Sequence, residues 1–286
     1  MGNGVADAYG DGEVALSVRE AGSRRLELNP IGILMSSEIP VDLIVEHLDD
    51  LLEVSKYDEG VPSNGLMVDA GRPVSRIAAA VNTSFASIQG AASIGAQLLL
   101  VHHTTWASID RHLKDRKEEA LRTWGVSLYG AHAALDCHPE FSNATTLASA
   151  LGVHVEGRFV PYGGGLAGAY GATGGTFDQF VDRAREALGV RVDAWKNSEQ
   201  FGRVGIVPGG GPWTSYLEEA QALGCDTYLT GEGTMYTKLF AREVGMNLVI
   251  ATHYATETRG IQALTSHVAA RFALPWEFVR EDMGLG

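Results

Sequence analysis

Hydrophobic positions recur along this chain in two alternating patterns. Apolar residues three or four apart predict helices, and short continuous apolar runs predict buried strands. The predicted helices cover Pro40–Lys56, Phe85–Ile94, Asp110–Trp124, Ala144–Leu151, Phe177–Leu188, Thr214–Leu223, Met235–Val244 and about Thr256–Phe272. The predicted strands cover Arg76–Val81, Gln97–Val101, Val126–Tyr129, Val190–Ala194, Val204–Val207, Thr227–Leu229 and Asn247–Ala251. Because strands alternate with helices, the sequence predicts an α/β fold with mostly parallel or mixed sheets flanked by helices.

Two segments fall outside this alternation. Residues 1–38 are rich in glycine at first and then contain two short β-like runs, Val14–Val18 and Leu26–Leu28. We expect them to form an N-terminal extension. Residues Pro161–Gly175 are again rich in glycine, which predicts either a hairpin or a flexible loop.

Length and composition place the chain among globular proteins. Its 286 residues, 45% of them hydrophobic, suffice for one large α/β domain or two ordinary ones. The net charge of −13 opposes binding to duplex nucleic acid and to anionic membranes. Apolar stretches fall far short of the roughly 20 residues that span a bilayer, so we expect a cytoplasmic protein with neither a membrane nor a nucleic-acid partner. Cys137 and Cys225 form no C-x-x-C pair and are expected to be free thiols, with Cys137 a buried structural thiol rather than a metal ligand.

Three short polar segments each follow a predicted buried strand. They are Val101–Thr105, which contains His102 and His103, then His132–Asp136, and finally Thr252–Glu257. Open α/β sheets build their sites at the carboxyl ends of their strands, so we expect these segments to meet. A lone pair of histidines is most often structural, and it is the shared placement after strands that indicates a site.

The side chains on these segments suit transition metals. Imidazole nitrogen and carboxylate oxygen favour Zn, Mn, Fe, Co or Ni over Ca or Mg, which prefer ligand shells made of oxygen alone. His102 and His103 end a strand where the chain begins to turn, so each can reach a different ion. His253 and Glu257 are four residues apart, which places them on one side of a helical turn, with Thr256 as the predicted N-cap and Glu257 as a bridge. We therefore predict two divalent transition-metal ions.

The charge of such a site indicates its substrate. Two divalent ions carry more positive charge than Asp136 and Glu257 can neutralise, so the site suits a small anionic substrate. Ions roughly 3.5 to 4 Å apart can lower the pKa of a shared water towards neutrality and polarise the bond under attack. Hydrolysis is the reaction that this chemistry favours.

Two further features lie at predicted strand ends. Gly209, Gly210 and Gly211 follow the strand Val204–Val207, and this turn is interpreted either as a loop that binds a substrate phosphate or as a tight connection to a helix. It matches neither the P-loop motif nor the dinucleotide-binding motif. Glu232 is interpreted as a general base or as a carboxylate that orients a ligand imidazole, and alternatively as a cap of the following helix.

The motifs resemble those of the Nif-three-like family, whose bacterial members are often labelled GTP cyclohydrolase type 2 homologues. The resemblance runs from about Ile39 to the C-terminus. It rests on segments similar to the family's Asp-Asn-x-Gly-Leu, His-His, Ser-x-His-x-x-x-Asp, Thr-Gly-Glu and Gly-His-x-x-Thr-Glu motifs. In this chain they are Ser63–Leu66, Val101–Thr104, Tyr129–Asp136, Thr230–Glu232 and Ala251–Glu257.

The resemblance implies a ligand set and an architecture. The implied ligands of two metals are His102, His103, Asp136, His253 and Glu257. His132 would line the same pocket as a catalytic residue. The implied subunit has two lobes, with the metal site in the cleft between them, and assembles into a ring, typically a hexamer. We expect one lobe to comprise residues 39–150 and 251–286, and the other to comprise residues 151–250 without the large middle insertion of many relatives.

The chain departs from the family pattern at two places. After Glu232 the family usually has one or two histidines, whereas this chain has Gly233–Tyr236, which removes a group suited to proton transfer. Asn82 replaces an aspartate that is common at the end of an early strand. Three functions therefore stay open. They are a dinuclear metal-dependent hydrolase that opens a purine nucleotide ring or cleaves a phosphate ester, a metal-binding adaptor or metal-handling protein without turnover, and a nucleotide-binding protein without metal.

Overall fold

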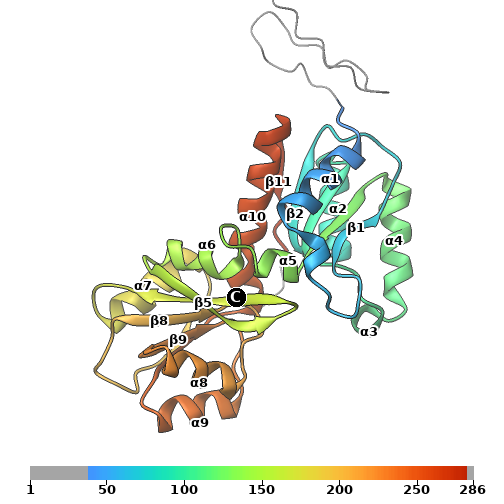
Figure 1. Cartoon of the computed structure of the whole chain (residues 1–286). Helices are drawn as coiled ribbons and strands as arrows, with labels where there is room; N and C mark the ends of the chain where they lie inside the picture. Colours follow the sequence, from blue (N-terminus) through green and yellow to red (C-terminus); the bar gives the residue numbers. More distant parts are fainter. Residues whose placement is uncertain (1–37, 282–286) are drawn as a thin grey trace, which may run out of the picture. The chain divides into compact units, whose positions relative to one another are not determined.

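The computed structural model describes residues 38–281 (Figure 1). These residues form two mixed sheets flanked by helices, as the sequence predicted. The predicted N-terminal extension, with its β-like runs Val14–Val18 and Leu26–Leu28, lies outside the described residues.

The first sheet has five strands in the order β1-β4-β3-β2-β11. Its strands are β1 (Asn64–Val68), β2 (Ile77–Asn82), β3 (Leu98–His103), β4 (Ser127–Ala131) and β11 (Trp276–Phe278). Neighbouring strands run parallel except for β1, which is antiparallel to β4. β1 and β11 are the two strands at its edges, and the sequence pattern did not predict either of them.

Helices cover both faces of this sheet. One core contains side chains of α1 (Val41–Leu51) and α10 (His253–Phe272), and the other contains side chains of α2 (Phe85–Ser93) and α4 (Leu113–Trp124). Successive residues of a strand point to opposite faces, so Leu98 and Leu100 enter the first core while Leu99 and Val101 enter the second. A strand buried on both faces reads as a continuous apolar run, which is why this one was recognisable in the sequence.

The second sheet has six strands in the order β5-β6-β8-β9-β10-β7. They are β5 (His154–Tyr162), β6 (Gly165–Ala172), β7 (Asp193–Trp195), β8 (Arg203–Val207), β9 (Thr227–Thr230) and β10 (Asn247–Ile250). β8, β9 and β10 run parallel, and the other pairings are antiparallel. α6 (Asn143–Ala150) and α7 (Phe177–Leu188) contribute to the core on one face, and α8 (Thr214–Ala222) and α9 (Met235–Glu243) to the core on the other. The glycine-rich stretch Pro161–Gly175 therefore belongs mainly to a β-hairpin and not to a flexible loop.

Several predicted boundaries were wrong. The helix expected over Pro40–Lys56 ends at Leu51, because Glu53 adopts a left-handed φ of 49° before the short 3-10 helix η1 (Val54–Lys56). The helix expected over Asp110–Trp124 begins only at Leu113, as α4, and Asp110 instead ends the separate short helix α3 (Ala107–Asp110). The strand expected over Val190–Ala194 is displaced towards the C-terminus, to Asp193–Trp195.

The start of α10 also differs from the prediction. Its N-cap is Thr252, whose hydroxyl accepts a hydrogen bond from the amide of Ala255 at 3.2 Å, and His253 is the first helical residue. Thr256 was expected to be the N-cap, but it lies inside the helix, where its hydroxyl accepts the amide N–H of Gly209 at 2.9 Å. Within residues 38–281, no helix combines the length and the apolar character that crossing a bilayer requires.

Candidate metal centre

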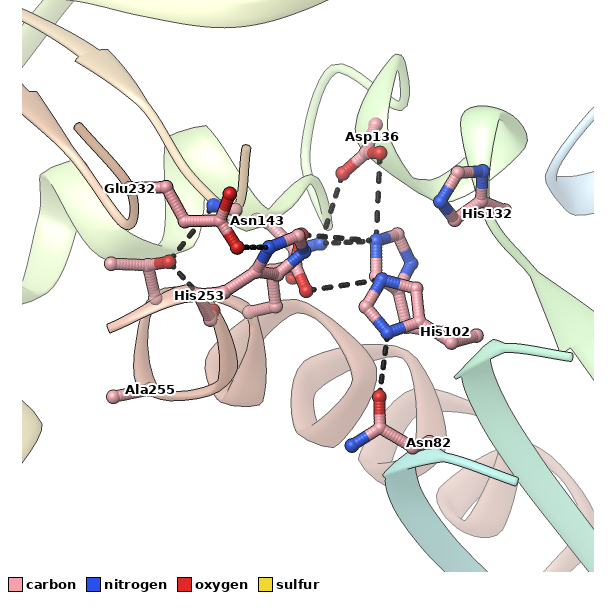
Figure 2. A network of polar contacts seen from close by, with 12 residues as sticks. Asn82, His102, His132, Asp136, Asn143, Glu232, His253 and Ala255 are labelled. Carbon is pink, nitrogen blue, oxygen red and sulfur yellow. Dashed lines mark hydrogen bonds and ion pairs between the residues drawn. The ribbon is translucent and has the colours of Figure 1, made fainter. Parts of the chain in front are cut away.

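The predicted ligands come from the ends of strands and from the first or last turn of helices, in both halves of the chain. His102 and His103 end β3, and His132 directly follows β4. His253 begins α10, and Glu257 lies one turn further along the same helix. Figure 2 shows His102, Asp136 and His253 pointing into one shared space, with His132 beside it.

His102 is a buried ring held from one side. Its Nδ1–H donates to the carbonyl oxygen of Ala131 at 2.8 Å, so its Nε2 points the other way. There Nε2 lies 3.5 Å from Oδ2 of Asp136 and 3.6 Å from Oε1 of Glu257. Burial by itself lowers the pKa of His102, but these two carboxylates raise it to about 10. Nε2 of His102 therefore faces negative charge from two directions.

The ring of His103 is held by β2, the neighbour of β3 on the side away from β4. Its Nδ1–H donates to Oδ1 of Asn82 at the end of β2, at 2.7 Å, whereas His102 is tied to the end of β4. This divergence lets adjacent histidines serve one site, with ring centroids 4.7 Å apart. Burial, helped by the neighbouring imidazoles, lowers the pKa of His103 to about 3 against the opposing effect of Glu257. The ring is therefore neutral, which is the form that binds a metal.

Glu257 lies among three imidazoles and is only 4% exposed. Its Oε1 is 3.2 Å from Nε2 of His253, and its Oε2 is 3.3 Å from Nε2 of His103. Because Nδ1 of neutral His103 carries the proton, Nε2 is an acceptor that faces an acceptor oxygen. Oε2 of Glu257 has no hydrogen-bond partner within residues 38–281. A buried acceptor without a donor is costly, and a cation between such atoms removes the cost, so these residues fit a metal.

Glu232 orients His253. The Nδ1–H of His253 donates to Oε1 of Glu232 at 2.7 Å, which directs Nε2 of the ring towards Glu257. The alternative interpretation of Glu232 as a helix cap is wrong, because Thr234 caps α9 by accepting the amide of Thr237 at 3.2 Å. Burial by itself lowers the pKa of His253, but its bonds to Glu257 and Glu232 raise it to about 9.

Nitrogen and oxygen donors converge in two groups of three. Among the described residues, His102, His103 and His132 have ligand atoms within 4.8 Å of one another, and so do His103, His253 and Glu257. Asp136 belongs to neither group, although its Oδ2 approaches His102, and its other oxygen accepts the side-chain amide of Asn143 at 2.9 Å. The structure thus gathers all the predicted ligands in one region and leaves Asp136 at its margin.

The glycine turn packs directly against the centre. Gly209 has a φ of +64°, and a Cβ there would overlap Oε1 of Glu257 and come within 3.0 Å of Nε2 of His253. Its amide donates to Thr256, and the amide of Gly211 donates to Oγ1 of Thr230 at 3.1 Å. Two of the three glycine amides are therefore used inside the protein. Phosphate binding by this turn stays a prediction that depends on the exposed Gly210.

Sequence reasoning missed four side chains around the centre. Nδ2 of Asn143 lies 3.3 Å from Nε2 of His102, and the ring of Trp106 lies 5.6 Å from that of His103. Glu59 and Tyr162 both contact His132, with the carboxylate of Glu59 2.6 Å and the hydroxyl of Tyr162 3.2 Å from its Nδ1. Asn143 follows a helix-capping serine, which is a structural signal only, and none of the four lies in the three segments that follow strands.

Cys137 behaves as a structural thiol. Burial raises its pKa to about 12, so the sulfur keeps its proton, which it donates to the carbonyl oxygen of Tyr162 at 3.3 Å. Cys137 and Cys225 are both free cysteines, as predicted.

Fold and site together define a mixed α/β protein with a buried histidine and carboxylate cluster that is able to hold metal. Residues 39–282 match the family described as Duf34/NIF3 (NGG1p interacting factor 3). The chain belongs to this family. The comparison confirms the resemblance inferred from the motifs.

Named relatives cover most of the chain. A Deinococcus radiodurans protein called "GTP cyclohydrolase 1 type 2 homolog" is 35% identical, over 87% of this chain and 95% of its own length. A protein of the same name from Allochromatium vinosum is 34% identical, over 84% of this chain and 95% of its own length. The crystal structure of TTHA1606 from Thermus thermophilus superposes with a TM-score of 0.74 at 30% identity, covering 86% of this chain and all of the other.

Proposed function

We propose that this protein is a dinuclear metal-dependent hydrolase that acts on a small anionic substrate, either a nucleotide-like molecule or a phosphate ester. The observation that carries the proposal is the pair of donor groups that share His103. When bound, two divalent transition ions supply Lewis acidity and activate water for attack. The relatives named GTP cyclohydrolase 1 type 2 homolog support a nucleotide-like substrate.

The chain's own residues divide the work of holding such ions. His253 and Glu257 form one side of the centre, and His102 and His132 form the other, with His103 common to both groups. Asp136 approaches Nε2 of His102 and adds a carboxylate at the edge. Only nitrogen and oxygen donors are present in these groups, which favours Zn, Mn, Fe, Co or Ni.

Two residues next to the donor atoms are proposed to take part in catalysis. Glu232 already accepts the Nδ1 proton of His253 and is 54% exposed, so it can also exchange a proton with solvent. His132 lies beside the ligand imidazoles, with its ring centroid 4.8 Å from that of His102. We propose both as catalytic residues. We also propose that Gly210, in the turn Gly209–Gly211, contacts the anionic part of the substrate.

The family resemblance also supports the assembly predicted from the sequence. We propose a two-lobed subunit, with residues 39–150 and 251–286 in one lobe and 151–250 in the other, and with the centre in the cleft between them. We propose that this subunit forms a ring, typically a hexamer, in the cytoplasm. Sedimentation equilibrium on the purified chain should give a single species of six subunits, and a monomer at micromolar concentration would contradict the ring.

The activity test uses protein that has been stripped of metal and reloaded with Zn²⁺, Mn²⁺ or Co²⁺. We expect turnover of GTP or of simple phosphate esters, and we expect the double variant His253→Ala/Glu257→Ala to lose both metal and activity. The matched control is His267→Ala, which removes an exposed histidine from the same helix outside both donor groups. Activity that survives in the double variant would contradict the proposal.

A metal-binding adaptor or metal-handling protein without turnover is the second candidate. It is favoured by the residues that stand where relatives carry histidines, since Met235 and Tyr236, which are 68% and 65% exposed, supply no imidazole there. This candidate predicts tight metal binding with no product across the same substrate panel. Product formation that depends on Glu257 would exclude it.

A further inference from the structure

His132 is held by its backbone in a fixed place. It lies between β4 and the short helix α5 (Ala133–Asp136). Its amide donates to Oδ1 of Asn64 at 2.8 Å, and the amide of Ala134 donates to the same oxygen at 3.1 Å. Because Asn64 begins β1, the edge strand clamps this turn against the end of β4. The backbone therefore gives the His132 ring a defined starting point beside the metal centre.

A carboxylate outside both donor groups holds the ring itself. Nδ1 of His132 is 2.6 Å from Oε1 of Glu59, in the loop between η1 and β1. The same Oε1 accepts the hydroxyl proton of Tyr162 at 2.8 Å. Its other oxygen, Oε2, accepts the side-chain amide of Asn64 at 3.1 Å and the backbone amide of Ala133 at 3.3 Å. Glu59 is thus surrounded by four donors.

These contacts make Glu59 a hydrogen-bond acceptor. Tyr162, Asn64 and Ala133 each direct an O–H or N–H group at its carboxylate oxygens, so the carboxylate needs no proton of its own to satisfy them. A carboxylate without a proton can only accept hydrogen bonds. Nδ1 of His132 therefore donates in its 2.6 Å contact with Oε1, and Nε2 is the nitrogen left for another partner.

The ring of His132 lies beside the other imidazoles of the centre. The rings of His102 and His103 lie 4.8 and 5.4 Å from that of His132, and the indole of Trp106 packs edge-on at 5.1 Å. Ligand atoms of the three imidazoles lie within 4.8 Å of one another. In metal sites, a carboxylate on the far nitrogen of a ligand histidine sets the tautomer and raises the basicity of the ring.

We propose that Glu59 is a positioning residue that fixes His132 with Nε2 unprotonated, and so makes His132 a direct ligand of the ion held by the three imidazoles. The proposal rests on the metal centre of the proposed function but not on turnover. The proposal assigns a different supporting carboxylate to each metal position. Glu59 supports the position that includes His132, and Glu232 supports the position that includes His253. Each position is then tunable by one carboxylate that does not itself bind metal.

The first measurement needs neither metal nor substrate. Metal-free protein labelled with ¹⁵N-histidine should show His132 as the tautomer with the proton on Nδ1, assigned by comparison with His132→Ala. Glu59→Gln keeps the size of the side chain but loses the charge, so it should shift His132 towards a mixture of tautomers. A proton on Nε2 of His132 in the unaltered protein would overturn the proposal, whatever the enzyme activity.

The second measurement is a calorimetric titration with Zn²⁺. The unaltered chain should bind two equivalents, and Glu59→Gln should weaken one of them about 10–100-fold and leave the other unchanged. Glu232→Gln is the matched variant, and it should weaken the other equivalent instead. The assignment is contradicted if Glu59→Gln binds two equivalents of Zn²⁺ with unaltered affinity. It is also contradicted if the unaltered chain binds a single equivalent.

A double-variant cycle tests whether Glu59 acts through His132. His132→Ala should weaken the same equivalent as Glu59→Gln, and the double variant Glu59→Gln/His132→Ala should be no weaker than His132→Ala alone. Additive losses would show that Glu59 acts by another route and would overturn the proposal. Tyr162→Phe leaves the charge of Glu59 in place and removes one donor, so it keeps the test available if Glu59→Gln does not fold. It should lower the affinity of this equivalent by less than tenfold and leave the other unchanged.

Discussion

Substitution of Gly209 by alanine tests how closely the glycine turn approaches the metal centre. Gly209 combines a φ of +64° with a site where an added Cβ would overlap Oε1 of Glu257. Glu257 cannot retreat freely, because it is buried among His102, His103 and His253. We therefore expect Gly209→Ala to displace the Glu257 carboxylate from its imidazole partners.

The magnitude follows from two separable costs. A non-glycine residue in the left-handed region costs about 1 kcal/mol. Overpacking of a tightly packed site adds roughly 1–3 kcal/mol. The free energy of unfolding should thus fall by about 2–4 kcal/mol. Because a proposed ligand moves, Zn²⁺ affinity should fall about tenfold or more.

Two other glycines isolate these costs. Gly152 has a φ of +67° with no atom within 4 Å of an added Cβ, so Gly152→Ala should lose only about 1 kcal/mol and bind Zn²⁺ normally. Gly210 adjoins the centre, but an added Cβ would be 3.7 Å from its nearest neighbour, so Gly210→Ala should change stability little. Urea unfolding and Zn²⁺ titration of the three variants provide the comparison. The reasoning fails if Gly209→Ala is no less stable than Gly152→Ala and binds Zn²⁺ as tightly as the unaltered protein.

Three further predictions concern the surroundings of the centre. Burial raises the pKa of Glu59, but its hydrogen bonds lower the pKa to about 2, which is below the value in the unfolded chain. The ionised carboxylate therefore stabilises the fold above pH 4.5, and this stabilisation is lost as the pH falls towards 2. Glu59→Gln should flatten this part of an acid-unfolding curve. Asn82→Asp should lose about 1–3 kcal/mol in urea unfolding, because Nδ2 of Asn82 donates to Oε2 of Glu281 at 3.1 Å and a carboxylate there would repel it, and Glu281→Gln should restore the loss. Bound Co²⁺ should quench the fluorescence of Trp106, whose ring lies 5.6 Å from that of His103; equal quenching in Trp106→Phe would contradict this placement.

The elements that sequence reasoning found and missed differ in burial. β3 was recognised because it is buried on both faces and reads as a continuous apolar run. β1 and β11 were missed because they are short edge strands with partly exposed, mixed residues. The start of α10 was misplaced because Thr252 and Thr256 are both suitable N-caps, and only the contact with Gly209 shows that the hydroxyl of Thr256 has another use.

The candidate site divides in the same way. The histidines and carboxylates that follow strands were found from residue type and local placement, and the structure brings them to one region. Glu59 and Asn143 were not found, since they meet their histidines across 73 and 41 residues of sequence. The phosphate-binding interpretation of the glycine turn depended on free amides, and two of the three amides are engaged by threonines from other elements.

By itself, the sequence determined the periodicity of the elements, the α/β class, the family and the chemical nature of the ligands, because each of these depends on residue type and on neighbours a few positions away. Only the tertiary structure decided which ligands share His103, that Asp136 lies at the margin, and that Glu59 supports His132 while Glu232 supports His253. Those facts depend on hydrogen bonds a few ångströms long between segments distant in the chain. Such distances are defined only when both sheets and α10 have folded together.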